Sequence, residues 1–133
     1  MPPNERSDAK DAPGPLQGLR VLVVEDGWHV ADALRLVLQR MGAAVTGPVA
    51  TASEAQSLAA ERRPDVAVVD VNLNGEMAYA LMDWLHDRGI RIIVITGYEE
   101  LPASLQKFSA ILHKPFTATA LRTALELAAG QRS

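Results

Sequence analysis

The stretch VLVVEDGW, residues 21–28, sets four consecutive aliphatic residues directly before two adjacent carboxylates. Four aliphatic residues in a row are typical of a strand buried on both faces, which occurs in parallel sheets covered by helices. One acid at the end of such a strand could cap a helix. Two adjacent acids, Glu25 and Asp26, indicate instead that a positively charged group is held where the strand ends.

Strand-like and helix-like segments alternate along the rest of the chain. Apolar runs bounded by turn residues predict strands over 19–24, 43–50, 66–70, 91–96 and 109–113. Between and after them, apolar residues at helical spacing predict helices, and the segment 97–108 has room for at most a short or irregular one. The sequence therefore predicts an α/β fold: a five-stranded parallel doubly wound sheet with about five helices on both faces.

Local signals locate three of the expected helices. Thr51 stands three residues before Glu54, the capping-box pattern of a helix start. Gly42 and Gly89 follow the first and third periodic segments and are expected to end those helices. The third helix is expected to carry an apolar face made of Met77, Leu81, Trp84 and Leu85.

Size and composition narrow the possible functions. A chain of 133 residues, 48% hydrophobic and 22% charged, is ordinary for one soluble domain, which we place at residues 16–130. The absence of cysteine excludes disulfides, thiolate metal sites and cysteine nucleophiles, and a net charge of −3 gives no reason to expect nucleic acid. Residues 1–15 contain four prolines and no apolar core, so we expect a flexible tail, not a signal peptide. No apolar run could span a membrane, and we expect a cytoplasmic protein.

Reactive side chains follow four of the five expected strands. In an open parallel sheet, ligands bind outside the carboxyl ends of the strands, and these ends carry Glu25-Asp26, Asp70, Thr96 and Lys114-Pro115. Each residue alone has an ordinary structural explanation, as a cap, a turn residue, a strand former or a solvated charge. Together they place three carboxylates at one edge, where each pair about 4 Å apart would repel by roughly 4 kcal/mol at an effective dielectric of about 20. A bound cation is therefore expected.

The chemistry of this set favours magnesium and a phosphoryl group. Carboxylate oxygens are hard ligands that suit Mg²⁺, and no histidine or cysteine is expected in the cluster, which disfavours zinc. Asp70 can attack a phosphoryl group as a nucleophile, with Mg²⁺ held by Asp26 and Asp70 and reached by Glu25 through water. The Thr96 hydroxyl and the Lys114 ammonium could then contact phosphoryl oxygens.

These positions, separated by 44, 26 and 18 residues from Asp26 onward, resemble the receiver domain of two-component response regulators. The resemblance covers residues 17 to about 130 and implies a flavodoxin-like strand order 2-1-3-4-5. It also implies that the Asn72 backbone carbonyl completes the Mg²⁺ site and that the Lys114–Pro115 peptide is cis. A histidine kinase or histidine phosphotransfer protein would donate the phosphoryl group, and the chain would be a signalling phosphoacceptor, not an enzyme, acting on an unknown downstream protein.

The sequence departs from the family pattern at several positions near the site. Ile111 stands where the family's switch aromatic is usual, three residues before the lysine. Tyr98 follows Thr96 by two residues, and this Thr-Gly-Tyr stretch resembles a subgroup of single-domain receivers, in which the ring could take over a gating role. Gly27 replaces a frequent acid. Trp28 either packs at the helix start, the interpretation we favour, or shapes kinase access.

Several functions remain open from the residues alone. A stand-alone receiver without an output domain is the first expectation, and the receiver module of a hybrid histidine kinase is the alternative. A degenerate receiver serving only as a binding module fits poorly with an intact acid cluster. A phosphohydrolase with an aspartate nucleophile would need an acid where Asn72 stands and the nucleophile on the first strand, not the third. Nucleotide binding lacks a GxxxxGK motif.

Overall fold

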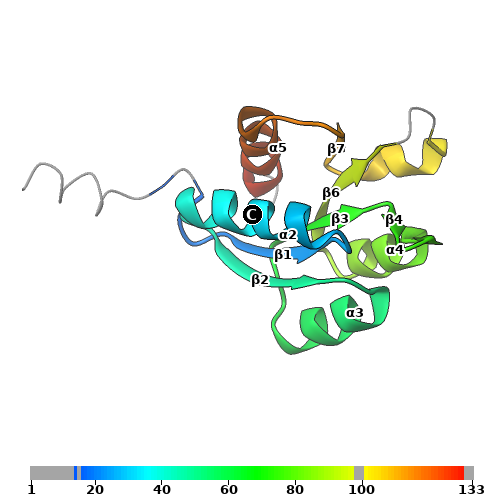
Figure 1. Ribbon diagram of the computed structural model, residues 1–133. Helices are drawn as coiled ribbons and strands as arrows, with labels where there is room; N and C mark the ends of the chain where they lie inside the picture. The colour runs from blue at the N-terminus through cyan, green and yellow to red at the C-terminus, as the bar shows by residue number, and fades with distance from the viewer. Residues whose placement is uncertain (1–13, 15, 98–100, 131–133) are drawn as a thin grey trace, which may run out of the picture.

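A five-stranded parallel sheet forms the centre of the computed structural model, which describes residues 14, 16–97 and 101–130 (Figure 1). The spatial order of its strands is β2-β1-β3-β6-β7, and a separate two-stranded sheet pairs β4 with β5. The strands are β1 (Arg20–Val24), β2 (Ala44–Val49), β3 (Val66–Asp70), β4 (Asn72–Leu73), β5 (Glu76–Met77), β6 (Arg91–Thr96) and β7 (Ala110–His113). The helices are α2 (Trp28–Arg40), α3 (Ala52–Glu61), α4 (Tyr79–Asp87) and α5 (Ala118–Gly130), with a 3₁₀ helix, η1, at Ala103–Lys107.

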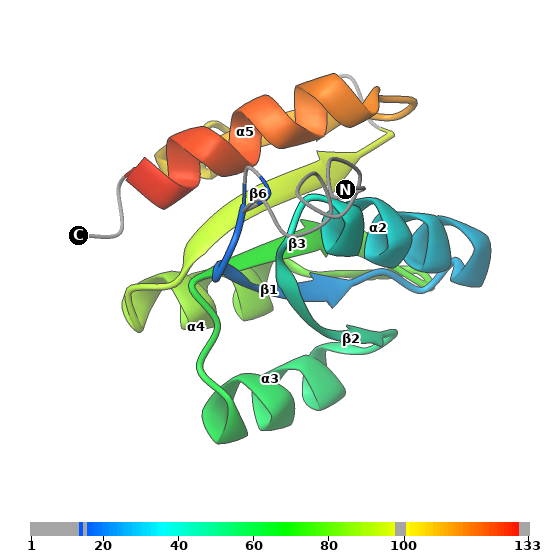
Figure 2. The same ribbon diagram turned by 90° about the vertical axis from the view of Figure 1, so that its left-hand side faces the viewer.

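Helices cover both faces of the sheet (Figure 2). Alternate residues of a strand point to opposite faces, so each strand contributes side chains to a core on either side. Leu22 and Val24 of β1 belong to the core on the side of α3 and α4, whereas Val21 and Val23 belong to the core on the side of α2 and α5. All five residues of β3 are buried. A central strand covered on both sides is a continuous apolar run, which is why the sequence pattern located it.

The predicted fold is confirmed. The five strands of the main sheet, numbered along the chain, lie in the order 2-1-3-4-5, and every neighbouring pair is parallel. The described residues form four α-helices and one 3₁₀ helix, so the expected short fourth helix is η1. Its segment folds around the buried side chains of Leu105 and Phe108.

Local details differ from the sequence-based expectations in two places. Met77 was expected on the buried face of the third helix, but it lies in β5 with 42% of its surface exposed, and α4 begins only at Tyr79. The prediction was wrong because a hairpin, invisible to helical periodicity, takes up the residues before the helix. β2, predicted as a strand over 43–50, shifts its register against β1 between Leu22 and Val24, and its Gly47–Pro48 peptide bond is cis.

The start of α3 shows the expected capping contacts. The Thr51 hydroxyl accepts a hydrogen bond from the Glu54 backbone N–H (3.1 Å), and the Glu54 carboxylate accepts one from the Ala50 N–H (3.3 Å). These contacts satisfy donors that a helix start otherwise leaves free. None of the helices in the described ranges is long and apolar enough to cross a membrane. The expected tail, residues 1–15, lies outside the described residues apart from Gly14.

Candidate functional site

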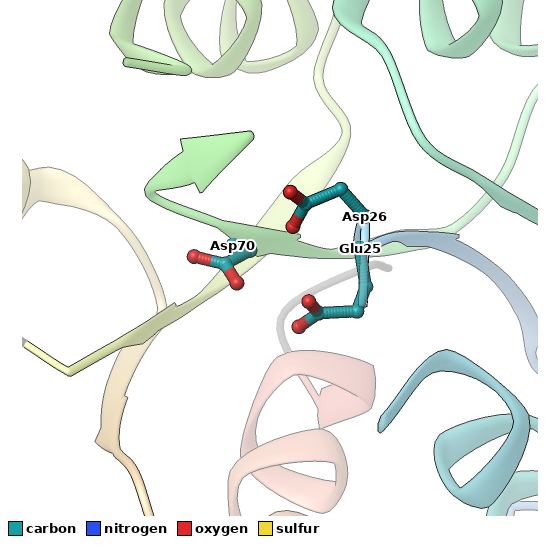
Figure 3. A group of neighbouring side chains, drawn as sticks. All are labelled: Glu25, Asp26 and Asp70. Carbon is teal, nitrogen blue, oxygen red and sulfur yellow. The ribbon is translucent and has the colours of Figure 1, made fainter. Parts of the chain in front are cut away.

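The reactive side chains gather at the edge of the sheet where the parallel strands end. Glu25 and Asp26 follow β1, Asp70 is the last residue of β3, and Lys114 follows β7. Carboxylate oxygens of Glu25, Asp26 and Asp70 lie within 4.8 Å of one another (Figure 3). The register explains this convergence, because β1 and β6 both pair with β3 and bring their carboxyl ends to the same edge.

Asp70 is held by a hydrogen bond at each carboxylate oxygen. Its Oδ1 accepts from the Asn72 backbone N–H (2.9 Å), and its Oδ2 accepts from the Lys114 ammonium (2.7 Å). The residue is only 5% exposed. Two fixed donors and a buried strand leave the carboxylate little freedom, so it is oriented toward the cleft before any ligand arrives.

Glu25 has an electrostatically unfavourable environment in the cluster. Its Oε2 accepts from the Gly27 N–H (3.0 Å), while its buried Oε1 accepts no hydrogen bond and has the Lys114 ammonium, 3.3 Å away, as its ion-pair partner. Burial raises the pKa of Glu25, the Gly27 hydrogen bond opposes that shift, and the charge of Asp70 adds to it. A carboxylate in this position favours an additional cation.

Lys114 links the acids to the neighbouring strands. Burial works to lower the pKa of Lys114, but the hydrogen bond and charge of Asp70, followed by the charge of Glu25, outweigh it, so the pKa is raised overall. The Lys114 backbone N–H donates to the Thr96 carbonyl (2.7 Å), which joins the ends of β7 and β6. Thr96 is fully buried, and the Lys114–Pro115 peptide bond is cis.

A hairpin follows Asp70, and the sequence-based prediction did not include it. Asn72–Leu73 pairs antiparallel with Glu76–Met77, and the two turn residues, Asn74 and Gly75, have φ angles of +56° and +90°. The Asn72 side-chain oxygen accepts from the Gly75 N–H (2.6 Å). Asn-Gly between short strands is the strongest sequence signal for such a turn, so this element could have been found.

The remaining predicted residues lie around this centre. Ile111, in β7, is half-buried against the core under η1, and Tyr98 lies outside the described residues. Trp28 is 70% exposed and stacks on the His29 ring, with centroids 3.7 Å apart. The expectation that Trp28 packs at the helix start was therefore wrong: the helix turns its ring to the solvent, and α2 buries Ala31, Leu34 and Leu38 instead.

Two adjoining hollows meet at the site. A polar cleft of about 540 Å³ contains the acids, with Asn72, Asn74 and Gly97 also on its walls. An apolar groove of about 630 Å³ runs between α2 and the start of α5, and residues on its walls include Val30, Ala33, Pro115 and Phe116. Val30 and Lys114 line both hollows, so the groove and the cleft lie side by side.

Residues 21–126 match the family model of the response regulator receiver domain. The chain belongs to this family. Receiver domains are signalling modules of two-component systems; as a family they bind Mg²⁺ at an acidic pocket and interact with kinases or phosphotransfer proteins. In this receiver the acidic pocket corresponds to the cluster of Glu25, Asp26 and Asp70.

Individual relatives agree with the family assignment. The uncharacterized transcriptional regulatory protein YbdJ of Bacillus subtilis (strain 168) is 32% identical over 93 residues, 68% of this chain and 40% of that protein, so the receiver spans under half of that relative's length. The signal receiver domain of a modulated diguanylate cyclase from Desulfovibrio desulfuricans G20 is 30% identical, with a TM-score of 0.76 and coverage of 85% of this chain and 94% of that one. The receiver domain of the PhyR response regulator from Erythrobacter litoralis has a TM-score of 0.80 at 23% identity, covers 90% and 96% of the two chains, and supports the fold alone.

Proposed function

We propose that this receiver accepts a phosphoryl group on Asp70, in the presence of Mg²⁺, from the phosphohistidine of a histidine kinase or a histidine phosphotransfer protein. The observation that carries the proposal is the orientation of Asp70, whose two oxygens are fixed by Asn72 and Lys114 beside two further acids. In the transfer, an Asp70 oxygen forms the new bond to phosphorus, the phosphorus–nitrogen bond breaks, and the histidine nitrogen leaves with the electron pair.

The acidic cluster fits a divalent cation. Three carboxylates and one ammonium leave a net charge of −2, and the buried Glu25 Oε1 lacks a hydrogen-bond donor. We assign Asp26 and Asp70 as direct ligands, Glu25 as a ligand through water, and the Asn72 backbone carbonyl as a further ligand. Bound Mg²⁺ supplies charge stabilisation to the transferring phosphoryl group.

Two residues of the chain would then bind the phosphoryl oxygens. Lys114 already donates to Asp70 Oδ2, so its ammonium is in place to contact a group attached to that carboxylate. Thr96 ends the neighbouring strand and would offer its hydroxyl to a second oxygen. Since Ile111 replaces the usual switch aromatic, we propose that gating falls to Thr96 with Tyr98, while Ile111 packs in the core under η1.

The apolar groove offers the phosphodonor a place to pack. It adjoins the cleft, and the exposed Trp28 is the first residue of α2, next to the groove residue His29. Large apolar side chains exposed beside a polar site mark a contact with another protein. We therefore propose that the donor docks against α2 and the start of α5. The receiver would then be located in the cytoplasm with the kinase.

The same proposal includes the domain organisation of the chain and the way in which the signal leaves it. Residues 16–130 form the receiver, and the signal passes to an unknown downstream protein by contact. The chain acts either as a stand-alone receiver or as the receiver module of a hybrid histidine kinase. Phosphotransfer from a separate kinase to the purified chain supports either arrangement, whereas detection of the native protein by immunoblot at the mass of this chain supports the first.

Intact mass spectrometry tests the phosphoacceptor function. The protein is incubated with acetyl phosphate, with and without Mg²⁺, as wild type and as the Asp70→Asn variant. One Mg²⁺-dependent phosphoryl adduct, absent from the variant, is the expected result. An adduct that persists in Asp70→Asn would show that another residue accepts the phosphoryl group. The absence of both an adduct and Mg²⁺ binding would indicate that the protein acts only as a binding module.

The role of the groove has its own test. Trp28→Ala should slow phosphoryl transfer from a phosphorylated histidine phosphotransfer protein by about tenfold, the size expected when a large interface anchor is removed. Labelling by acetyl phosphate should stay unchanged, because a small donor needs no groove. Leu127→Ala, which removes another exposed apolar side chain from α5, is the matched control. Equal slowing with both donors would place Trp28 in the chemistry of the cleft instead.

A further inference from the structure

Arginines gather at the edge of the sheet opposite the acidic cleft. This is the edge where the parallel strands begin and α2, α3 and α4 end; the starts of β1, β3 and β6 and the ends of α3 and α4 lie toward the left of Figure 2. Six of the eight arginines in the described ranges lie there: Arg20, Arg40, Arg62, Arg63, Arg88 and Arg91. The carboxylates of the cleft lie at the other end of the strands, roughly 16 Å away for a strand of five residues. The receiver is thus electrically polarised along its strands.

Two of these arginines converge on one corner, between the ends of α3 and α4. The Arg88 guanidinium lies 3.7 Å from the centroid of the Trp84 ring and donates to the Trp84 carbonyl (3.1 Å). A guanidinium nitrogen of Arg63 lies against Gly89, only 3.1 Å from where a β-carbon would stand. Gly89, with φ +78°, directly follows Arg88, so the chain turn that ends α4 also makes room for the side chain that follows α3. The arginine corner is defined here as Arg62, Arg63 and Arg88.

The arginine corner has no carboxylate partner within the described part of the chain. Asp65, two residues after Arg63, accepts hydrogen bonds from the Arg20 backbone N–H (2.9 Å) and guanidinium (3.4 Å), and neither Glu61 nor Asp87, the acids directly before Arg62 and Arg88, forms an ion pair with these arginines. The ion pairs formed by the described residues involve none of the three corner arginines. The carbonyl ends of α3 and α4 favour positive charge nearby, which explains one cation at each helix end. It does not explain why the Arg63 side chain reaches Gly89, the residue directly after Arg88.

The Arg88 guanidinium lies over the Trp84 ring, and a planar guanidinium presents a fork of donors that can bind a carboxylate at two points. Nucleic acid fits this surface poorly, because its affinity requires many phosphate contacts along an extended basic stripe and the chain carries a net charge of −3. We propose that the arginine corner docks an acidic segment of a partner protein, with several Asp or Glu residues in succession. Because the corner lies at the edge opposite Asp70, this partner can remain bound while the cleft exchanges phosphoryl groups.

Fluorescence anisotropy with a labelled decapeptide of alternating Asp and Glu tests the proposal at low salt. Wild type should bind the peptide and bind its Asn/Gln counterpart at least about tenfold more weakly. The Arg63→Gln/Arg88→Gln variant should lose about tenfold in affinity, whereas Arg35→Gln/Arg122→Gln, which removes the same charge from α2 and α5, should lose less than about twofold. Arg62→Gln/Arg63→Gln leaves the Trp84 contact intact and should show a similar loss if the corner variant proves unstable.

Each outcome of this experiment supports or overturns docking of an acidic segment. Equal losses in the corner and control variants would reduce the binding to general charge attraction. Tighter binding of a single-stranded DNA decamer than of the peptide would assign the corner to nucleic acid. Absence of binding at about 1 mM peptide would overturn the proposal. The Asp70→Asn variant should bind the peptide as wild type does, which keeps this result independent of the phosphoacceptor chemistry.

Discussion

Replacing Glu25 by glutamine should make the metal-free protein more stable, although it removes an ion pair with Lys114. The charges can be compared directly. With oxygens within 4.8 Å, Glu25 repels Asp26 and Asp70 by about 3.5 kcal/mol each at an effective dielectric of about 20. Its attraction to the ammonium at 3.3 Å is about 5 kcal/mol on the same scale. The variant therefore loses more repulsion than attraction, and water around Asp26 reduces the net gain to about 1–2 kcal/mol.

The pH dependence of this gain follows from the pKa of Glu25, which is raised above its ordinary value of 4.5. Below that value the side chain is protonated in both the folded and the unfolded state, so wild type and Glu25→Gln should have equal stability. As the pH rises, the unfolded state releases its proton first, and the free energy of unfolding of wild type falls relative to the variant. The difference should be complete once the pH exceeds the raised folded pKa.

Urea denaturation at pH 4 and pH 7, in EDTA and in 10 mM Mg²⁺, measures these effects. In EDTA at pH 7 the Glu25→Gln midpoint should exceed that of wild type. Mg²⁺ should stabilise wild type more than the variant, because a ligand at a given concentration stabilises the folded state more when it binds more tightly. Glu126→Gln, which removes an exposed acid paired with Arg122, should change stability by less than about 0.5 kcal/mol. A Glu25→Gln protein less stable than wild type in EDTA would show that the ion pair with Lys114 outweighs the repulsion between the acids.

Three further predictions use stability or metal binding as the measurement. Thr51→Ala should lower the free energy of unfolding by about 1 kcal/mol in urea denaturation, because the Glu54 N–H loses its cap. Asn74→Ala should lower it by about 1 kcal/mol, whereas Asn74→Gly should be tolerated, because only the former strains a residue at φ +56°; equal effects would contradict the turn. Lys114→Met should lower it by about 3 kcal/mol in EDTA, since the buried Asp70 loses its ion-pair partner, and calorimetric titration should show tighter Mg²⁺ binding.

The sheet and the edge that carries the site could be predicted from the sequence, because both depend on residue patterns that do not require tertiary contacts. Central strands such as β3 are apolar throughout, and polar residues that end them must meet at one edge once the sheet is parallel. The short η1 segment was also predictable, from the lack of room between the last two strands. These inferences need only periodicity, length and the chemistry of the strand ends.

Other features depend on tertiary packing, which no local pattern contains. The direction of the Trp28 ring depends on how α2 is rotated against the sheet, and the two apolar residues Val30 and Ala33 lie outside the core for the same reason. The assignment of Met77 to a helix failed because helical spacing continued by chance through a hairpin. The strand order predicts that Lys114 lies near Asp70, although 44 residues separate them in the sequence. It does not predict the length of the hydrogen bond between them.

The shared position of Lys114 connects the charge of Asp70 to the shape of the neighbouring strands. Its ammonium divides between Asp70 Oδ2 at 2.7 Å and Glu25 Oε1 at 3.3 Å, while its backbone N–H holds the Thr96 carbonyl at 2.7 Å. A phosphoryl group on Asp70 would carry about 1.5–2 negative charges in place of the single charge of the carboxylate, and it would draw the ammonium toward the phosphoryl oxygens. Because the same residue is tied to β6 through its backbone, this shift would act first on the end of β6, where Thr96 stands. This link does not depend on the usual switch aromatic. A receiver with Ile111 at that position can therefore still transmit the phosphorylation state of Asp70 through the ends of β6 and β7.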